Sequence, residues 1–151
     1  MFYVPLLFLC LIQSVKPFTV VILPDTQKFV RYYPYVYEEM TTWISKNKDK
    51  ENIVFVGHVG DIVDNENQPL QWQRARSSMD ILAQGNVPFG TAPGNHDLSF
   101  NDVVKGKPLP YIENFGPKSL YQTSDPSKGI MEDQSWYGGS SISGQSSYQI
   151  I

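Results

Sequence analysis

Cysteine, histidine and clustered basic residues are scarce in this sequence. The 151 residues include one cysteine and two histidines, and 12 Lys and Arg stand against 15 Asp and Glu, for a formal net charge of −3. The sequence has no basic run, which argues against a surface for nucleic acid or anionic lipid. A content of 41% hydrophobic and 13% aromatic residues argues against disorder, and the length allows one domain at most. Small-molecule and ester chemistry remain open.

Hydrophobic runs are also short, the main one being at the N-terminus. Phe2 to Ile12 (FYVPLLFLCLI) spans about eleven residues, whereas a helix that crosses a bilayer needs about twenty, so we expect no stable membrane anchor. The run is typical of a signal peptide at residues 1–15 and of a secreted or extracytoplasmic protein. A buried first strand or helix is the alternative, because no basic residue precedes the run. If the run is removed, Cys10 goes with it and no thiol nucleophile or disulfide remains.

Apolar, β-branched stretches alternate with amphipathic ones in the first two thirds of the chain. This pattern predicts strands at 18–23, 53–57 and 87–92, the first buried on both faces, and helices at 35–48 and 69–84. Such alternation is typical of an α/β fold, with a β-α-β-α-β parallel sheet and covering helices. After Asp97 the periodicity is lost. We expect a long surface excursion to residue 133, a Ser- and Gly-rich segment, and a strand that begins in the last four residues.

Polar side chains follow each of the three predicted strands. The segments are PDTQ (24–27), GDIVDN (60–65) and GNHD (94–97). The carboxyl ends of parallel strands share one edge of the sheet, which is where ligands bind in open α/β sheets. That edge would gather oxygen donors and one imidazole, a set that can hold divalent metals: Asp25, Gln27, Asp61, Asn95 and His96.

The spacing within these segments supports a metal site. In an extended chain Asp25 and Gln27 point the same way, so both can reach one ion. Gly60 and Gly94 allow tight turns before the short side chains that follow them. If two metals lie about 3.5–4 Å apart, one carboxylate can bridge them, and Asp61 is the natural bridge.

The three segments, each after a strand and with helices between them, resemble those of the calcineurin-like metallophosphoesterase superfamily. The resemblance covers residues 18–97 most closely, and it implies that residues 18–151 form the N-terminal half of the family's sandwich. It also implies two divalent ions, with Fe, Zn, Mn and Mg not distinguished. In such a site Asp25 and Gln27 bind the first metal, Asp61 bridges the two, and Asn95 binds the second.

The resemblance further implies a reaction. A metal-bound hydroxide attacks the phosphorus of a small phosphate mono- or diester in line, without a covalent enzyme intermediate. His96 protonates the leaving group and stabilises charge in the transition state. The substrate is then a small phosphate ester, and the oligomeric state is left open.

Two features depart from the family pattern. Gln27 stands where the family usually has histidine, as in a secreted or periplasmic branch with Asp-x-Gln. The later GH and GHxH motifs are missing, and His58 and His96 are the only histidines. We therefore expect a chain that is cut short at its C-terminus. The alternative to a phosphoesterase is a noncatalytic, truncated protein that binds a metal or a partner.

Several neighbouring residues have two possible roles. Asp64 and Asn65 either cap the next helix, which we favour, or orient Asp61. Asp97 either bonds His96 or holds its loop, and His58 is expected to pack within its strand rather than to support a ligand.

Caps and aromatic residues complete the expectations for the helices and their surroundings. Asn67 is a candidate cap for the second helix and Gly85 its stop. Core positions are expected for Trp43, Trp72 and the cluster Tyr32-Tyr33-Pro34-Tyr35, a substrate wall being the alternative for the cluster.

Overall fold

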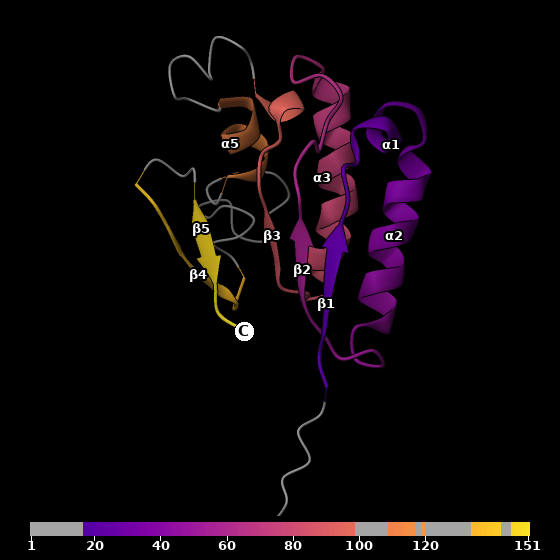
Figure 1. Cartoon of the computed structure of the whole chain (residues 1–151), viewed down its shortest axis with the longest axis vertical. Helices are drawn as coiled ribbons and strands as arrows, with labels where there is room; N and C mark the ends of the chain where they lie inside the picture. The colour runs from indigo at the N-terminus through magenta and orange to yellow at the C-terminus, as the bar shows by residue number, and fades with distance from the viewer. Residues whose placement is uncertain (1–16, 99–108, 117–118, 120–133, 143–145) are drawn as a thin grey trace, which may run out of the picture.

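The centre of the molecule is a parallel sheet of three strands, β1 (Thr19–Leu23), β2 (Ile53–His58) and β3 (Phe89–Thr91), in the order β1-β2-β3 (Figure 1). The computed structural model describes residues 17–98, 109–116, 119, 134–142 and 146–151. Leu23, His58 and Thr91 pair across the sheet. The three strands therefore end level with one another, and the segments that follow them leave from the same edge.

Three helices pack together on one side of this sheet: α1 (Gln27–Tyr32), α2 (Pro34–Asn47) and α3 (Pro69–Gln84) (Figure 1). Each of the two longer helices begins with proline, whose missing N–H is not needed in a first turn. Gly85 ends α3 and donates its backbone N–H to Ile81. The buried side chains between helices and sheet include Leu23, Val30, Tyr37, Ile44, Val56, Trp72, Met79 and Phe89. The predicted β-α-β-α-β order with a parallel sheet is confirmed.

The first strand differs from the prediction, because only one of its faces is covered by described residues. Leu23 is buried toward the helices, whereas Val20 and Ile22 are 46% and 60% exposed. Parallel pairing and a β-branched composition were read as burial on both faces, yet the helices α1 to α3 lie on a single side. The exposed face of β1 is therefore apolar.

Several local expectations about the helices were wrong. No helix was predicted between the first strand and residue 35, but α1 lies there. The residue that caps α3 is Gln68, not Asn67, and its side chain makes no capping hydrogen bond. Trp43 is 54% exposed, because Tyr37, Thr41 and Ile44 supply the buried stripe of α2.

The expectation that the tyrosine cluster near the start of α2 packs in the core was also wrong. Tyr32, Tyr33 and Tyr35 are 55%, 53% and 63% exposed. Their rings contact one another, with centroids 6.2 Å apart for the first pair and 6.5 Å for the second. The cluster lies on the surface rather than under the sheet.

The later part of the chain adds a helix and a hairpin beside β3. The predicted surface excursion contains α5 (Leu109–Phe115), whose Phe115 ring lies 6.1 Å from that of Trp72. The hairpin consists of antiparallel strands β4 (Tyr137–Ser140) and β5 (Ser147–Gln149), and Trp136 just before it packs 5.1 Å from the Phe89 ring. The predicted terminal strand is thus present, and it starts one residue earlier than expected.

Two sequence expectations fall outside the structural description. Residues 1–16 are not described, so the signal peptide stays a prediction. Most of the segment 99–133 is not described either, so the surface excursion stays a prediction there. Among the described residues, no helix has the length and apolarity needed to cross a membrane.

Candidate functional site

The three polar segments meet at the level edge of the sheet, close to α1 (Figure 1). The backbone N–H of Thr26 donates to the carbonyl oxygen of Asp61 at 3.2 Å, which joins the first segment to the second. The backbone N–H of His96 donates to Asp61 Oδ1 at 3.0 Å, which joins the third segment to the second. Asp61 is therefore the residue on which all three segments converge.

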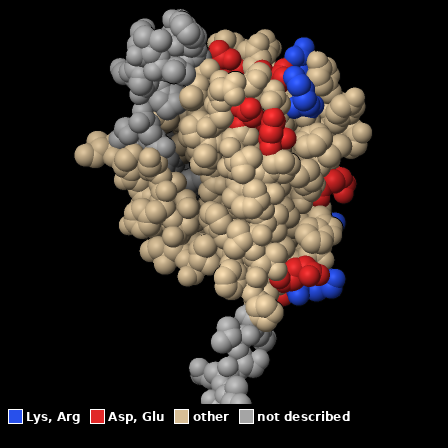
Figure 2. Space-filling view, viewed as in Figure 1, with Lys and Arg blue, Asp and Glu red and all other residues tan. Residues whose placement is uncertain are grey.

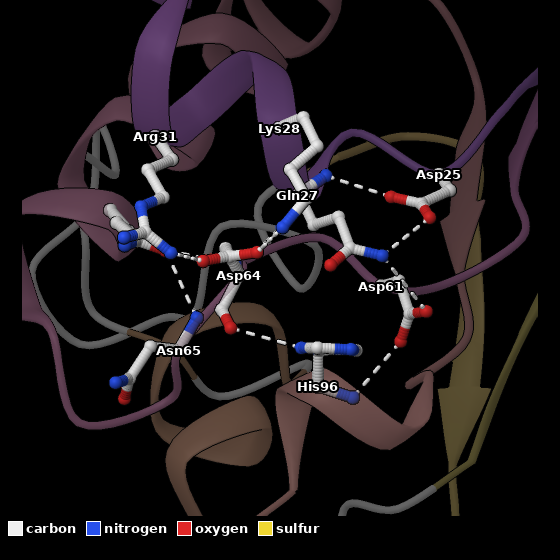
Figure 3. Close-up of polar contacts among 9 residues, drawn as sticks. Asp25, Gln27, Lys28, Arg31, Asp61, Asp64, Asn65 and His96 are labelled. Carbon is white, nitrogen blue, oxygen red and sulfur yellow. Dashed lines mark hydrogen bonds and ion pairs between the residues drawn. The ribbon is translucent and has the colours of Figure 1, made fainter.

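Asp25 and Asp61 face a common point that is bridged by the amide of Gln27 (Figure 3). Gln27 Nε2 lies 2.6 Å from Asp25 Oδ2 and 3.5 Å from Asp61 Oδ2, and the Gln27 backbone N–H donates to Asp25 Oδ1 at 2.9 Å. Sequence spacing anticipated that Asp25 and Gln27 would act together, but through an extended chain. In the structure Gln27 begins α1, and its side chain folds back onto Asp25.

Backbone geometry aims the Asp61 side chain at this point. Gly60 has φ +101° and Asp61 itself φ +49°, a left-handed conformation that Asp tolerates better than most residues. A Cβ on Gly60 would lie 2.6 Å from the backbone nitrogen of Gly94, and one on Gly94 would collide with the Asp61 carboxylate. Gly60 supplies a tight turn, as expected. Gly94, whose φ is −95°, is needed for close approach instead.

Both the backbone and the ring of His96 are held by hydrogen bonds. Its backbone binds Asp61, and its ring Nδ1 lies 2.9 Å from the carbonyl oxygen of Asp64. A carbonyl oxygen only accepts, so Nδ1 carries the hydrogen. The half-buried ring therefore leaves Nε2 as the nitrogen available for proton transfer.

Asp97 holds the loops together and does not bond the His96 ring. Its fully buried carboxylate accepts backbone hydrogen bonds from Ile62 at 3.1 Å, Val63 at 3.0 Å and Gly94 at 2.8 Å. Burial raises the pKa of Asp97, and these three donors oppose that rise. Of the two roles open from the sequence, the structure selects the second.

Asp64 and Asn65 do not cap α3, contrary to the favoured expectation. The backbone N–H groups of both donate to Gln71 Oε1, at 2.8 and 3.1 Å, and Asn65 Oδ1 accepts from the backbone of Asn67. The Asp64 carboxylate instead binds Lys28 and Arg31 of α1 (Figure 3). Hydrogen bonds from Lys28 and then Arg31 lower the pKa of Asp64.

His58 packs within β2, as expected, and it also ties two of the segments together. It is 3% exposed, and burial lowers its pKa to about 4. Its Nδ1 accepts from the backbone N–H of Gly60, so Nε2 carries the hydrogen and faces the hydroxyl of Thr26 at 3.1 Å. Thr26 in turn donates to the carbonyl oxygen of Ile62. A neutral His58 therefore stabilises the loops that carry Asp25 and Asp61.

Sequence reasoning missed Thr26, Lys28 and Arg31. Thr26 stands between two predicted ligands, and its full burial was not expected in a polar segment. Lys28 and Arg31 are three residues apart, a spacing that places them on one helix face. That signal was hidden because no helix was predicted there.

Comparison with known proteins places this chain in a family. A family model described as calcineurin-like phosphoesterase matches residues 18–148. The chain belongs to the calcineurin-like phosphoesterase family. A curated relative, "Uncharacterized protein YvnB" of Bacillus subtilis (strain 168), is 39% identical over 85 residues, which cover 56% of this chain and 7% of that protein. The chain thus spans a small part of the relative's length. No solved structure matches the chain significantly.

Calcineurin-like phosphoesterases generally bind divalent metals, and the donor set at this edge fits such ions in part. In the described part of the chain, no group of three or more His, Cys, Asp or Glu side chains is placed to hold a metal. Asp25 and Asp61 nevertheless converge on one polar group of Gln27, which offers an oxygen when its amide is rotated. Asn95 is exposed in η1 (Asn95–Asp97), beside His96. Asp25, Asp61 and the amide of Gln27 thus offer oxygen ligands that suit a hard cation.

Proposed function

We propose that this protein is a metal-dependent phosphoesterase that hydrolyses a small phosphate mono- or diester at a site for two divalent ions. The observation that carries the proposal is the convergence of Asp25 and Asp61 on Gln27, with His96 bound to the same Asp61. Asp25 and Gln27 would hold the first ion, Asp61 would bridge, and Asn95 would hold the second. The ions would supply positive charge that lowers the pKa of a bound water and offsets the charge of the phosphate.

The residues of the chain contribute orientation and a proton. The Asp64 carbonyl oxygen accepts from His96 Nδ1 and so fixes the ring, which leaves Nε2 for the substrate. When the ring carries a proton on both nitrogens, Nε2 can donate to the leaving oxygen. Asp97 and the His58–Thr26 pair keep the three segments in register, because each binds backbone or side-chain groups of a neighbouring segment. Preorganisation of this kind is what positions a proton donor over its substrate.

Two substitutions test the proposal. Asp61→Ala is expected to abolish Mn²⁺ binding, and His96→Ala to leave Mn²⁺ bound while lowering the hydrolysis of p-nitrophenyl phosphate or its diester by about 10²–10⁴-fold. Calorimetric titration with Mn²⁺ and release of p-nitrophenol are the two measurements. Full activity in both variants would refute the proposal.

A noncatalytic metal-binding protein is the second candidate. It is favoured by the two-histidine composition, since His58 is buried on Thr26 and only His96 is left for the site. Mn²⁺ binding that depends on Asp61, without hydrolysis by the wild-type chain, would support this candidate over the first.

We also propose that the protein is secreted or extracytoplasmic. The apolar run at Phe2 to Ile12 supports this location. N-terminal sequencing of the protein recovered from the culture medium of an expressing host would test it, with cleavage near Ser14 as the expected result.

A further inference from the structure

The clearest feature outside the proposed metal ligands is a pair of basic side chains on α1. Lys28 and Arg31 both bind the carboxylate of Asp64 (Figure 3). The Asp64 side chain is 5% exposed, whereas those of Lys28 and Arg31 are 60% and 48% exposed. The two cations therefore reach from solvent onto a buried anion at the border of the site.

Lys28, Arg31 and Asp64 together have a surplus of positive charge and of N–H donors. Two cations on one carboxylate leave a net positive charge of one. An ammonium has three N–H donors and a guanidinium five, and each cation here spends a single one on Asp64. The Arg31 guanidinium also lies 4.8 Å from the centre of the Tyr32 ring, which orients it without using a donor. Donors on both side chains thus remain directed to solvent.

The Asp64 loop does not depend on the pair for its position. Gln71 Oε1 accepts the backbone N–H groups of Asp64 and Asn65, and Asp97 accepts those of Ile62 and Val63. A clamp on this loop would need one cation at most. The second cation therefore calls for another explanation.

The pair lies next to the proposed proton donor. The same Asp64 that binds Lys28 and Arg31 through its carboxylate binds His96 Nδ1 through its carbonyl oxygen at 2.9 Å. The rest of the edge is acidic, with Asp25, Asp61 and Asp97. In Figure 2 side chains of both signs gather at the end where α1 lies, and a second mixed group lies at the opposite end. The pair is thus a cationic patch beside the leaving-group side of the site.

We propose that Lys28 and Arg31 form a second anion subsite, which binds a further phosphate on the leaving group of the substrate. The substrate class would be organic bisphosphates, in which one phosphate is hydrolysed and the other is held by this pair. Charge-assisted donors of Lys and Arg are well suited to phosphate oxygens. The inference rests on the proposed function, since it assumes that the scissile phosphate lies at Asp25 and Asp61.

The test compares two ligands that differ by one phosphate, fructose 1,6-bisphosphate and fructose 6-phosphate. Their affinities are measured by calorimetry with saturating Mn²⁺ for the wild-type chain and for Lys28→Gln/Arg31→Gln. The wild type is expected to prefer the bisphosphate, and the double variant to lose about tenfold of that preference. The charge-conserving variant Lys28→Arg/Arg31→Lys should retain most of the preference for the bisphosphate. Lys50→Gln, at an ion pair with Glu51 away from the site, is the matched control.

The outcomes separate this inference from the proposed function. Equal affinity of the wild type for both ligands, or a preference that survives in Lys28→Gln/Arg31→Gln, overturns the second subsite. If Mn²⁺ does not bind and no ester is hydrolysed, the proposed function fails. A bisphosphate preference that the double variant loses would then show an anion site at Lys28 and Arg31 that does not depend on a metal. Thermal unfolding of each variant tests whether a lost preference is due to unfolding. The charge-conserving variant tests whether the preference depends on charge or on the shape of the side chains.

Discussion

Asp61 shows how neighbouring residues fix the direction of a single side chain. Its φ of +49° is unusual for a residue with a side chain, and such strain persists only where surrounding contacts determine it. Thr26 binds its carbonyl oxygen, His96 binds its carboxylate, and Gly94 leaves room for that carboxylate. The backbone strain at Asp61 lowers the stability of the fold, and in exchange the carboxylate points toward Asp25 and Gln27.

Gly94 provides the first test at this scale. Gly94→Ala would place a Cβ on the Asp61 carboxylate and backbone nitrogen, so Asp61 must shift. We expect Mn²⁺ affinity to fall by at least about tenfold and the free energy of unfolding by about 1–3 kcal/mol. Calorimetry with Mn²⁺ and urea denaturation measure the two effects.

Gly57→Ala is the matched control for this substitution. A Cβ there would lie 3.3 Å from the flexible end of Ile22, and Gly57 is in β2 rather than in the site. Equal losses of metal affinity in both variants would show that the close approach at Gly94 has no special importance.

At the scale of elements, the sequence predicted the long helices and the strands, whose apolar residues recur periodically. It missed the short helices α1 and α5. The two long helices and three strands carry apolar stripes or runs, so their positions were recovered. The helix α1 has six residues with a single buried one, Val30, which is too few for a periodic signal. The helix α5 lies in a segment whose prolines concealed it, although Tyr111 and Phe115 are buried.

The position of the candidate residues was predicted better than their contacts. Asp25, Gln27, Asp61 and His96 were expected at one edge, and the structure brings them there. Which partner each side chain takes depends on tertiary distances that sequence spacing does not contain. This is why Asp64 was assigned to a cap, while in the structure it binds two cations from a helix that lies 33–36 residues earlier in sequence.

The helix α3 carries a buried acid that gives a testable pH dependence. Asp80 is 3% exposed, and among the described residues neither of its carboxylate oxygens has a hydrogen-bond partner. Burial raises its pKa to about 7, while the charge of Arg76, one turn earlier, opposes the rise. In the unfolded chain the pKa is near 4. Between these values the native state binds the extra proton, so stability falls as pH rises from about 4 to 7 and is level above that.

Asp80→Asn removes this titration. The free energy of unfolding of the wild type should fall relative to that of the variant by roughly 2–4 kcal/mol between pH 4.5 and pH 8. Urea denaturation at both pH values measures the difference, and the exposed Glu39→Gln on α2 is the control. Because His58 titrates in both proteins, its opposite contribution cancels in the comparison. Parallel pH profiles for wild type and Asp80→Asn would contradict the assignment.

The molecule as a whole is a sheet with one face covered by helices and a polar edge. Its described residues bury a core between β1 to β3 and α1 to α3, while Val20 and Ile22 remain exposed on the other face. Asp64 binds Lys28 and Arg31 at the edge where Asp25 and Asp61 also lie, in a chain of net charge −3. The level strand ends, the Lys28–Asp64–Arg31 contacts and the candidate ligands therefore lie at the same end of the molecule.

The most direct measurement is anomalous X-ray diffraction from crystals of the protein soaked in Mn²⁺. The proposed site predicts two anomalous peaks, one in contact with Asp25, Gln27 and Asp61 and the other with Asp61 and Asn95, with the Gln27 amide oxygen turned toward the first ion. No peak at Asp61 in crystals saturated with Mn²⁺, or peaks only at other carboxylates, would contradict a metal-dependent phosphoesterase site at this edge.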